Sequence, residues 1–443
     1  MAFKVFFDSP EKNKGKLHFH YKGGSPKLVD ELIRTIEENK NDILEINLAW
    51  YLFNNWVLHD YLKRISKEGI IVNVITIPLE GYDNSNPKKL KLENGDLTDI
   101  SYTKYDLAKS IFHEIFFCKD LPNYNIYFFP HIYLRSSYVK KFSRGNFPYS
   151  LHLKAGYIKK KEGEIIAISS SNMAVRDLTK FESLLIIEDE SAYQVSFRQF
   201  FGELLKNSIN IKNFSTALNT ANIDYPHIPS PSGEKAFFTA PFYFDSSNRL
   251  EDELLKILSG AKEKIIICAQ HLAAFNYKFK AQYHSQIKEN QMRQGILGKI
   301  LELAKTGIRV TCLSQTFAPP DSLQSKFENH NFRAPSNKVN FKNFIDELEK
   351  TNSADYFVNK NIHSKFIIVD DLLVFCTYNF TPTQFSYLDS VEIDQFTHMP
   401  DMSYKGIHCE VSAHVIVDND DICASFNRHV RTIIDADTTI KVL

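Results

Sequence analysis

The sequence has few cysteines, no net charge and no long apolar run, and each absence excludes a class of protein. Six cysteines are scattered over 443 residues without Cys-x-x-Cys spacing, which argues against a disulfide framework or a zinc site and fits reduced thiols. The 53 basic residues balance 53 acidic ones, so the chain is not a uniformly basic nucleic-acid binder. No stretch of about 18 uncharged apolar residues occurs, so we expect no membrane-spanning helix.

The size and composition of the chain predict a two-part globular protein. The hydrophobic fraction of 43% supports a sizeable core, and the length fits two domains or two fused halves. A stretch rich in Asn, Pro and Ser predicts a linker at 216–234, between an N-terminal half at 1–215 and a C-terminal half at 235–443. The start lacks a signal-peptide core and cleavage site, so we expect a cytoplasmic protein without stable membrane association.

Two distant stretches carry the same groups in the same order: histidine, one residue, lysine, an apolar run, a hydroxyl residue, one residue, asparagine. The first motif consists of His152, Lys154, Ser170 and Asn172. The second motif consists of His363, Lys365, Thr377 and Asn379. On a strand, residues i and i+2 point to one face, so each histidine is expected beside its lysine, and the next strand delivers the hydroxyl and the amide.

This set of groups suits the chemistry of a phosphodiester. One imidazole can attack phosphorus and form a covalent intermediate, while another protonates the leaving oxygen and then activates water. Lysine and asparagine side chains can hold the non-bridging oxygens, where charge develops in the transition state. We therefore expect neither a metal nor another cofactor.

The second motif resembles the signature of the phospholipase D superfamily, H-x-K-x4-D followed by G-S-x-N. The matching residues are His363, Lys365, Asp370 and Asn379, with Cys376 and Thr377 in place of glycine and serine. The first motif departs from the signature, because Lys159 stands where the aspartate falls and Ser169 replaces the glycine. In the resembled family that aspartate is considered structural, so its loss does not by itself remove the chemistry.

The resemblance implies an α/β protein with two pseudo-symmetric αβαβα sandwich halves of the phospholipase D type packed around one shared active site. It also implies a phosphohistidine mechanism. It favours His152 as the nucleophile and His363 as the general acid and base, although pseudo-symmetry leaves the reverse assignment open. Because one chain carries both halves, a monomer suffices for one site.

An acid that orients a catalytic histidine is a further feature of the resembled family. Glu182 is the candidate in the first half and Glu410 in the second half, with Glu392 as the alternative to Glu410. Both preferred acids precede an aspartate and a Ser-Phe pair at similar spacing, with a one-residue difference that a β-bulge can absorb. For each of these two acids, the alternative interpretation is a solvated carboxylate at a sheet edge.

Helices and strands are also predicted to repeat before each motif. Ser25 is expected to cap a helix in the first half, and Asn248 a helix in the second half. Further helices are expected to end at Gly69 and Gly307, each followed by a strand. The alternation of strand, helix and strand predicts a largely parallel sheet.

Basic residues cluster near the first motif. Those expected to bind substrate are Lys159, Lys160 and Lys161, and Lys140, Lys141 and Arg144 extend the cluster. Such residues can hold a nucleic-acid backbone, although Lys159 to Lys161 are equally explained as a solvated hairpin tip. Two insertions, 315–339 and 382–407, are expected to be substrate-facing loops.

The sequence therefore favours a metal-independent nuclease acting on DNA or RNA, with nucleic acid as its substrate partner. A phospholipase D or phosphatidyltransferase uses the same residues and stays an alternative, although no strongly basic amphipathic helix is present. A decayed site that only binds nucleic acid is the third reading. A role in bacterial DNA restriction or antiviral defence is compatible with a nuclease, but no residue indicates it.

Overall fold

The computed structural model divides the chain into two compact units. The described residues are 2–13, 26–51, 53, 55–76, 121–129, 151–173, 175–210, 228–231, 233–240, 242–243, 246–272, 295–315, 344–380 and 410–443. The first unit is Met1–Phe244 with Leu388–Ala413, and the second is Asp245–Tyr387 with His414–Leu443. A segment from late in the chain thus belongs to the first unit. Most of the expected linker, 216–234, lies outside the described residues.

The first unit contains an eight-stranded mixed sheet. Its strands are β1 (Phe3–Asp8), β2 (Ile43–Trp50), β3 (Ile71–Thr76), β4 (Tyr124–Phe128), β5 (Lys154–Lys160), β6 (Glu164–Ser169), β7 (Glu182–Glu188) and β8 (Ile209–Asn210). They lie in the order β1-β7-β6-β5-β2-β3-β4-β8. The pairs β2–β3 and β3–β4 are parallel, and β5, β6 and β7 pair antiparallel. The prediction of a largely parallel sheet is therefore wrong, because β5 returns antiparallel to β2 and continues into hairpin-like pairs. The predicted hairpin after the first motif is therefore β5–β6.

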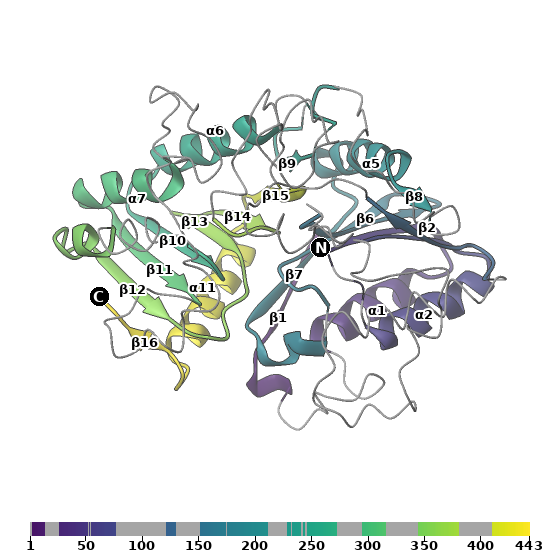
Figure 1. The fold of residues 1–443 in the computed structure, drawn as a ribbon, viewed down its shortest axis with the longest axis horizontal. Helices are drawn as coiled ribbons and strands as arrows, with labels where there is room; N and C mark the ends of the chain where they lie inside the picture. Colours follow the sequence, from purple (N-terminus) through teal and green to yellow (C-terminus); the bar gives the residue numbers. More distant parts are fainter. Residues whose placement is uncertain are drawn as a thin grey trace, which may run out of the picture. The chain divides into compact units, whose positions relative to one another are not determined.

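Helices cover both faces of this sheet (Figure 1). Helices α1 (Lys27–Asn39) and α2 (Trp56–Lys67) lie on one face, and α5 (Ser191–Lys206) lies on the other. The 3-10 helices are η1 (Glu11–Asn13) and η3 (Val175–Thr179). Because both faces are covered, the apolar run of β6 is fully buried, which explains why it does not alternate with polar residues.

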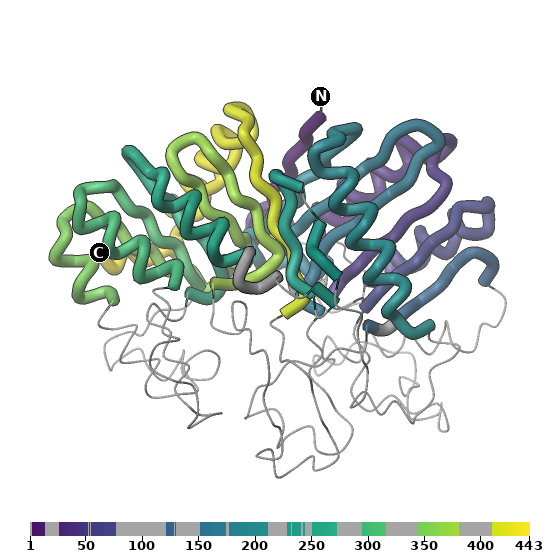
Figure 2. Tube along the Cα trace, turned by 90° about the horizontal axis from the view of Figure 1, so that it is seen from above, coloured from purple at the N-terminus to yellow at the C-terminus, as the bar shows by residue number. Residues whose placement is uncertain are grey.

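The second unit repeats this architecture. Its strands are β10 (Lys264–Ala269), β11 (Arg309–Ser314), β12 (Ala354–Val358), β13 (Phe366–Val369), β14 (Leu372–Cys376), β15 (Ser412–Val417) and β16 (Ile440–Lys441). The sheet order is β16-β12-β11-β10-β13-β14-β15-β9, where β9 is Ala236–Thr239. Helices α6 (Ser246–Ser259) and α7 (Gly295–Lys305) lie on one face, and α11 (Asp420–Ile434) lies on the other. In Figure 2 the yellow β15 and α11 lie against the green β13–β14 hairpin.

The α/β fold with two pseudo-symmetric halves is confirmed, and so is the repeat of elements before each motif. Helix α2 is followed by Gly69 with φ +105°, and α7 by Gly307 with φ +95°, and both glycines lead into a strand. This left-handed conformation disfavours side chains with a Cβ atom, which explains glycine at both helix ends. None of the helices in the described ranges has the length and apolar character needed to cross a bilayer.

The predicted helix starts are less accurate. Pro26 takes the N-cap position of α1 without a side-chain cap, so Ser25 is not the cap residue. Helix α6 begins at Ser246, which places Asn248 inside the helix rather than before it. The predicted start of α1 differs by one residue and that of α6 by three, within the usual uncertainty of helix boundaries predicted from sequence.

Candidate active site

The first motif lies where the chain enters β5. His152 precedes the strand, and its backbone N–H donates to the carbonyl of Val411 at 2.9 Å. Lys154 is the first residue of β5 and is fully buried, and its Nζ donates to the carbonyl oxygen of His152 at 3.0 Å. The prediction that both residues lie within a strand is therefore wrong for His152. The lysine instead holds the backbone of the histidine, which fixes both groups at the strand entrance.

Glu410 contacts the imidazole of His152. Its Oε2 atom lies 3.0 Å from Nδ1 of the histidine. The backbone carbonyl of Glu410 accepts a hydrogen bond from the hydroxyl of Thr239 at 2.6 Å. The ring of Tyr51 stands edge-on to the imidazole, with the ring centroids 5.6 Å apart. A carboxylate on Nδ1 fixes the orientation of the ring and leaves Nε2 as the nitrogen that can meet a reactant.

The pairing of acids with histidines predicted from the sequence is wrong. The sequence predicts that Glu182 orients the histidine of the first half, His152, and assigns Glu410 to the second half. The structure places Glu410 on His152 instead, because the segment that carries Glu410 belongs to the first unit. Glu182 begins β7, where its Oε2 atom accepts a hydrogen bond from the hydroxyl of Ser170 at 2.5 Å. Glu392, the alternative acid, lies outside the described residues.

The loop after β6 carries the hydroxyl and the amide of the first motif, as predicted. Ser170 bonds Glu182, and the hydroxyl of Ser171 bonds Oδ2 of Asp177 at 2.5 Å. The indole N–H of Trp50 donates to the carbonyl of Ser171 at 3.1 Å. These contacts hold the loop that presents Asn172. The Oδ1 atom of Asn172 is buried and accepts no hydrogen bond from the residues that the structure describes.

The second motif reproduces this arrangement at the entrance of β13. His363 and Lys365 precede the strand, and Nζ of Lys365 donates to the carbonyl of His363 at 2.5 Å. The hydroxyl of Ser364, between them, lies 3.0 Å from Nε2 of His429 on α11. Both lysines thus bond the carbonyl of the histidine two residues earlier. The shared bond shows that the two motifs have the same local geometry in their own units.

The loop after β14 carries Thr377 and Asn379. Thr377 is buried, and the Oδ1 atom of Asn379 accepts a hydrogen bond from the backbone N–H of His271 at 3.2 Å. The hydroxyl of Tyr378, between them, lies 2.8 Å from Nδ1 of His414. Burial lowers the pKa of His414 to about 3, so this imidazole is neutral at working pH. The Tyr378–His414 pair anchors the loop after β14, as the Ser171–Asp177 pair anchors the loop after β6 in the first unit.

Asp370 ends the signature of the second motif and has a structural role. It lies at the turn between β13 and β14 with φ +52°. Its carboxylate accepts hydrogen bonds from the backbone N–H groups of Lys262, Glu263 and Lys264 at 2.9–3.0 Å. Partial burial opposes ionisation, but these three bonds hold the pKa of Asp370 below its ordinary value. The side chain therefore ties the hairpin to the start of β10.

The three lysines predicted to bind substrate lie at the other end of β5. Lys159 and Lys160 end the strand, seven and eight residues beyond His152, which corresponds to about 23 Å of extended chain. Lys160 pairs with Asp189 at 3.0 Å, and Nζ of Lys161 donates to the carbonyl of Asn41 at 2.8 Å. The structure does not bring these lysines together with the first motif, so a shared role in holding one phosphate is not supported.

Other predicted substrate contacts lie outside the described residues. They are Lys140, Lys141, Arg144, the insertion 382–407 and all of the insertion 315–339 except Gln315.

Two mixed sheets with helices on both faces, each carrying a His-x-Lys strand entrance and a downstream hydroxyl-x-Asn loop, define the phospholipase D type of fold. Solved structures share it. Polyphosphate kinase from Porphyromonas gingivalis matches 99% of this chain and 48% of its own, with TM-score 0.51 and 8% identity. Phosphatidylserine synthase from Haemophilus influenzae matches 100% of this chain and 87% of its own, with TM-score 0.53 and 12% identity.

A third structure, the phospholipase D family member Nuc from Salmonella typhimurium, matches 47% of this chain and 95% of its own, with TM-score 0.27 and 13% identity. The chain spans about half the length of the polyphosphate kinase. No protein-family model matches the sequence, and a search of curated proteins finds no match. At these identities the first two likenesses establish a shared fold, while the activity has to be argued from the residues.

Proposed function

We propose that the chain is a metal-independent phosphodiesterase, and specifically a nuclease that cleaves DNA or RNA through a phosphohistidine intermediate. The observation that carries the proposal is the imidazole of His152, held at Nδ1 by Glu410 and at its backbone by buried Lys154. His363 and Lys365 repeat the lysine-to-carbonyl bond on the second sheet. Two such imidazoles supply the two functions that cleavage of a phosphodiester requires.

In the proposed reaction, Nε2 of His152 attacks phosphorus and the bond from phosphorus to the leaving oxygen breaks. His363 donates its proton to that oxygen as the product departs. His363 then takes a proton from water, and the resulting hydroxide attacks the phosphohistidine. The phosphorus–nitrogen bond breaks, which releases the phosphate product and restores His152. Both units contribute one histidine to the same phosphorus in this proposal, so one chain makes one site.

The remaining motif residues stabilise charge in this scheme. The non-bridging oxygens are held by Lys154, Lys365, Asn172 and Asn379, and the hydroxyls of Ser170 and Thr377 contact the substrate. Loss of one such donor typically slows an enzyme about a hundredfold or more. The buried Oδ1 of Asn172 without a described partner supports a role for this amide in binding a ligand.

Nucleic acid is preferred over lipid because the first unit carries consecutive lysines, Lys159 to Lys161, away from the motif. A polymer presents many phosphates, so it can meet basic residues about 20 Å from the bond that is cut, whereas one lipid head group cannot. The lipid-acting alternative uses the same histidines, so substrate assays decide between them.

The test is a panel of single- and double-stranded DNA and RNA and phosphatidylcholine vesicles, incubated with the protein in EDTA. We expect cleavage of at least one nucleic acid by the wild-type chain and none by His152→Ala. The substitution Lys256→Ala, at an exposed position of α6, is a control for contaminating nucleases. Head-group release without nucleic-acid cleavage supports the lipid alternative. Nucleic-acid binding without cleavage of any substrate supports the decayed binding module.

A further inference from the structure

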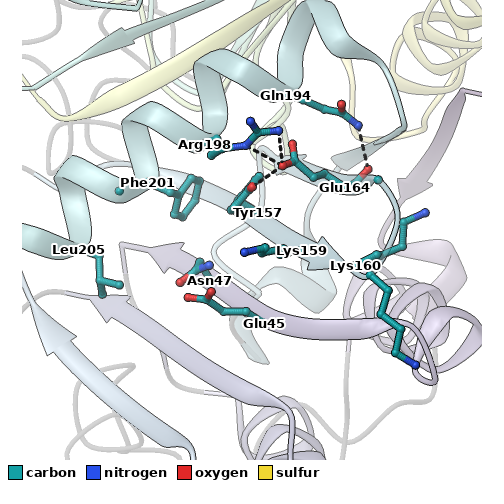
Figure 3. Close-up of a pocket in the computed structure, with 13 residues that line it drawn as sticks. Glu45, Asn47, Tyr157, Lys159, Lys160, Glu164, Gln194, Arg198, Phe201 and Leu205 are labelled. Atoms are coloured by element: carbon teal, nitrogen blue, oxygen red, sulfur yellow. Dashed lines mark hydrogen bonds and ion pairs between the residues drawn. The ribbon is translucent and has the colours of Figure 1, made fainter.

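The first unit contains a pocket away from the first motif. This hairpin pocket has a volume of about 660 Å³ and lies between the β5–β6 hairpin, β2 and helix α5 (Figure 3). Its polar lining includes Glu45, Asn47, Tyr157, Lys159, Glu164 and Arg198. Tyr157 and Lys159 alternate with Lys154 along β5 and therefore point to the opposite face of the sheet. The hairpin pocket is thus separate from the first motif.

A row of three linked amides, two of them buried, fixes one side of the hairpin pocket. Asn47, Asn73 and Asn125 are register partners on β2, β3 and β4. Asn125 donates to Asn73 at 3.1 Å, and Asn73 donates to Asn47 at 2.9 Å and to Oε1 of Glu45 at 3.0 Å. Both N–H groups of the Asn73 amide are therefore used. The row holds Glu45 and Asn47 in fixed orientations at the pocket.

Ion pairing fixes the opposite side. Oε1 of Glu164 accepts hydrogen bonds from the hydroxyl of Tyr157 at 2.6 Å and from Nε of Arg198 at 2.7 Å. Burial raises the pKa of Tyr157, and its bond to Glu164 raises that pKa further. Glu164 itself is 6% exposed, and its Oε2 accepts no hydrogen bond from any described residue. The carboxylate is thus held rigidly and keeps spare acceptor capacity.

The fold does not require this polar row. In the second unit, the register positions that correspond to the amide row carry Ile266, Thr311 and Asp355. The position that corresponds to Lys159 carries Asp370, which ties down its own hairpin. Replacing both partners of a buried hydrogen bond by apolar groups of the same shape can leave stability nearly unchanged. Three linked amides on one sheet face therefore point to a use beyond folding.

We propose that the hairpin pocket binds a nucleoside phosphate. Lys159 is exposed and supplies a cation for the phosphate, and Arg198, whose side chain is 58% exposed, is a second cation in the pocket lining. Glu45 and Asn47 supply acceptors for sugar hydroxyls or a base amino group. A ligand with an anionic end and a hydrogen-bond-donating end can use both the cations and the acceptors of the pocket. Free phosphate can use only the cations, and a nucleoside only the acceptors. The volume lies within the range of about 300–1,000 Å³ that is usual for small-ligand sites.

The inference does not depend on the proposed reaction, because it is tested on a protein without the reacting histidines. Calorimetric titrations of the His152→Ala/His363→Ala chain compare adenosine 5′-monophosphate and adenosine 5′-triphosphate with adenosine and with pyrophosphate. We expect both nucleotides to bind at least about tenfold more tightly than either fragment. Equal binding of pyrophosphate, or no binding of nucleotides, overturns the proposal.

Substitutions in the same protein locate the site. Lys159→Gln and Glu45→Gln each weaken nucleotide binding at least about tenfold. Gly202 lines the pocket from α5, and no atom lies within 4 Å of the position that a Cβ takes there. Gly202→Trp is therefore expected to fold and to block the pocket, while Gly202→Ala leaves it open. Unchanged nucleotide binding in Gly202→Trp overturns the assignment to this pocket.

A last comparison identifies the source of the nucleotide. The probes are adenosine 5′-monophosphate and a 5′-phosphorylated deoxyadenosine dinucleotide, titrated into the same protein. Tighter binding of the dinucleotide indicates that the pocket takes the end of a strand, and tighter binding of the mononucleotide indicates a free ligand. Both outcomes support the proposal, and binding of the dinucleotide that survives Gly202→Trp contradicts it.

Discussion

The two units place the same motif on the same framework, yet they differ at the far end of the hairpin that follows it. In the second unit Asp370 accepts three backbone hydrogen bonds and closes the hairpin. In the first unit Lys159 stands at this position and lines a pocket, and Asp189 accepts the hairpin bonds instead, from the N–H of Glu164 and from Lys160. Asp189 thus takes the structural role in the first hairpin that Asp370 has in the second, and Lys159 lines the hairpin pocket.

The largest expected effect tests whether the two motifs are equivalent. His152→Ala and His363→Ala should each lower kcat by about a thousandfold or more, because nucleophile and acid are both required. Mass spectrometry of a quenched reaction should find the phosphoryl group on His152. An adduct confined to His363 reverses the assignment of roles.

Mixing the two variant proteins sharpens this prediction. If one chain makes one complete site, equal amounts of His152→Ala and His363→Ala should stay inactive together. Recovery of activity on mixing contradicts the single-chain site, because it requires that one chain supplies a histidine to another.

The contact between Glu410 and His152 predicts the next largest effect. Glu410→Gln should lower kcat by about 10²- to 10⁴-fold with little change in KM, because the ring loses the charge that orients it while substrate contacts persist. Glu182→Gln is the matched comparison, since Glu182 bonds Ser170. Steady-state kinetics measure both variants. A larger kcat effect for Glu182→Gln than for Glu410→Gln contradicts the role assigned to Glu410.

The stability of the first unit should depend on pH through Asp8. Burial raises the pKa of Asp8 from 3.8 to about 6, and the charge of Glu182 adds to this. The folded state therefore binds a proton that the unfolded state releases, so stability falls as pH rises from about 4 to about 6, by at most about 3 kcal/mol. Asp8→Asn should flatten this dependence in denaturant titrations. Asp60→Asn, an exposed substitution on α2, should leave it unchanged.

The pH dependence of stability due to Asp370 should have the opposite sign to that due to Asp8 and should be smaller. Its pKa is lowered, so its contribution to stability is present above the ordinary carboxyl pKa and is lost as the solution is acidified. Asp370→Ala should destabilise the protein by about 1–2 kcal/mol at pH 7. Asp189→Ala, its counterpart in the first unit, should cost less because Asp189 is 53% exposed. If denaturant titrations show that both substitutions lower the free energy of unfolding equally, the two aspartates do not differ in their contribution to the hairpins as proposed.

The sequence predicted the fold and the motif positions because both are encoded locally. Apolar runs, a glycine after each helix and a polar turn specify strands, helix ends and hairpins over a few residues. The hairpin that links His152 to Asn172 was read correctly for this reason.

The partners of the motif residues were not predictable, because they are distant in the sequence. Glu410 reaches His152 through a segment that leaves the second sheet and joins the first unit, and no spacing rule encodes that path. His414 and Asp177 anchor the two motif loops as buried acceptors or donors, and neither is distinguished by its neighbours in the chain. The register of a distant strand decides such contacts.

The late position of Glu410 has a consequence for synthesis on the ribosome. Every strand of the first sheet has been translated by Asn210, yet the carboxylate that contacts His152 is added only 200 residues later, at Glu410. A nascent or prematurely terminated product therefore has the histidine without its partner. The contact between the imidazole and the carboxylate can form only after translation has passed Glu410.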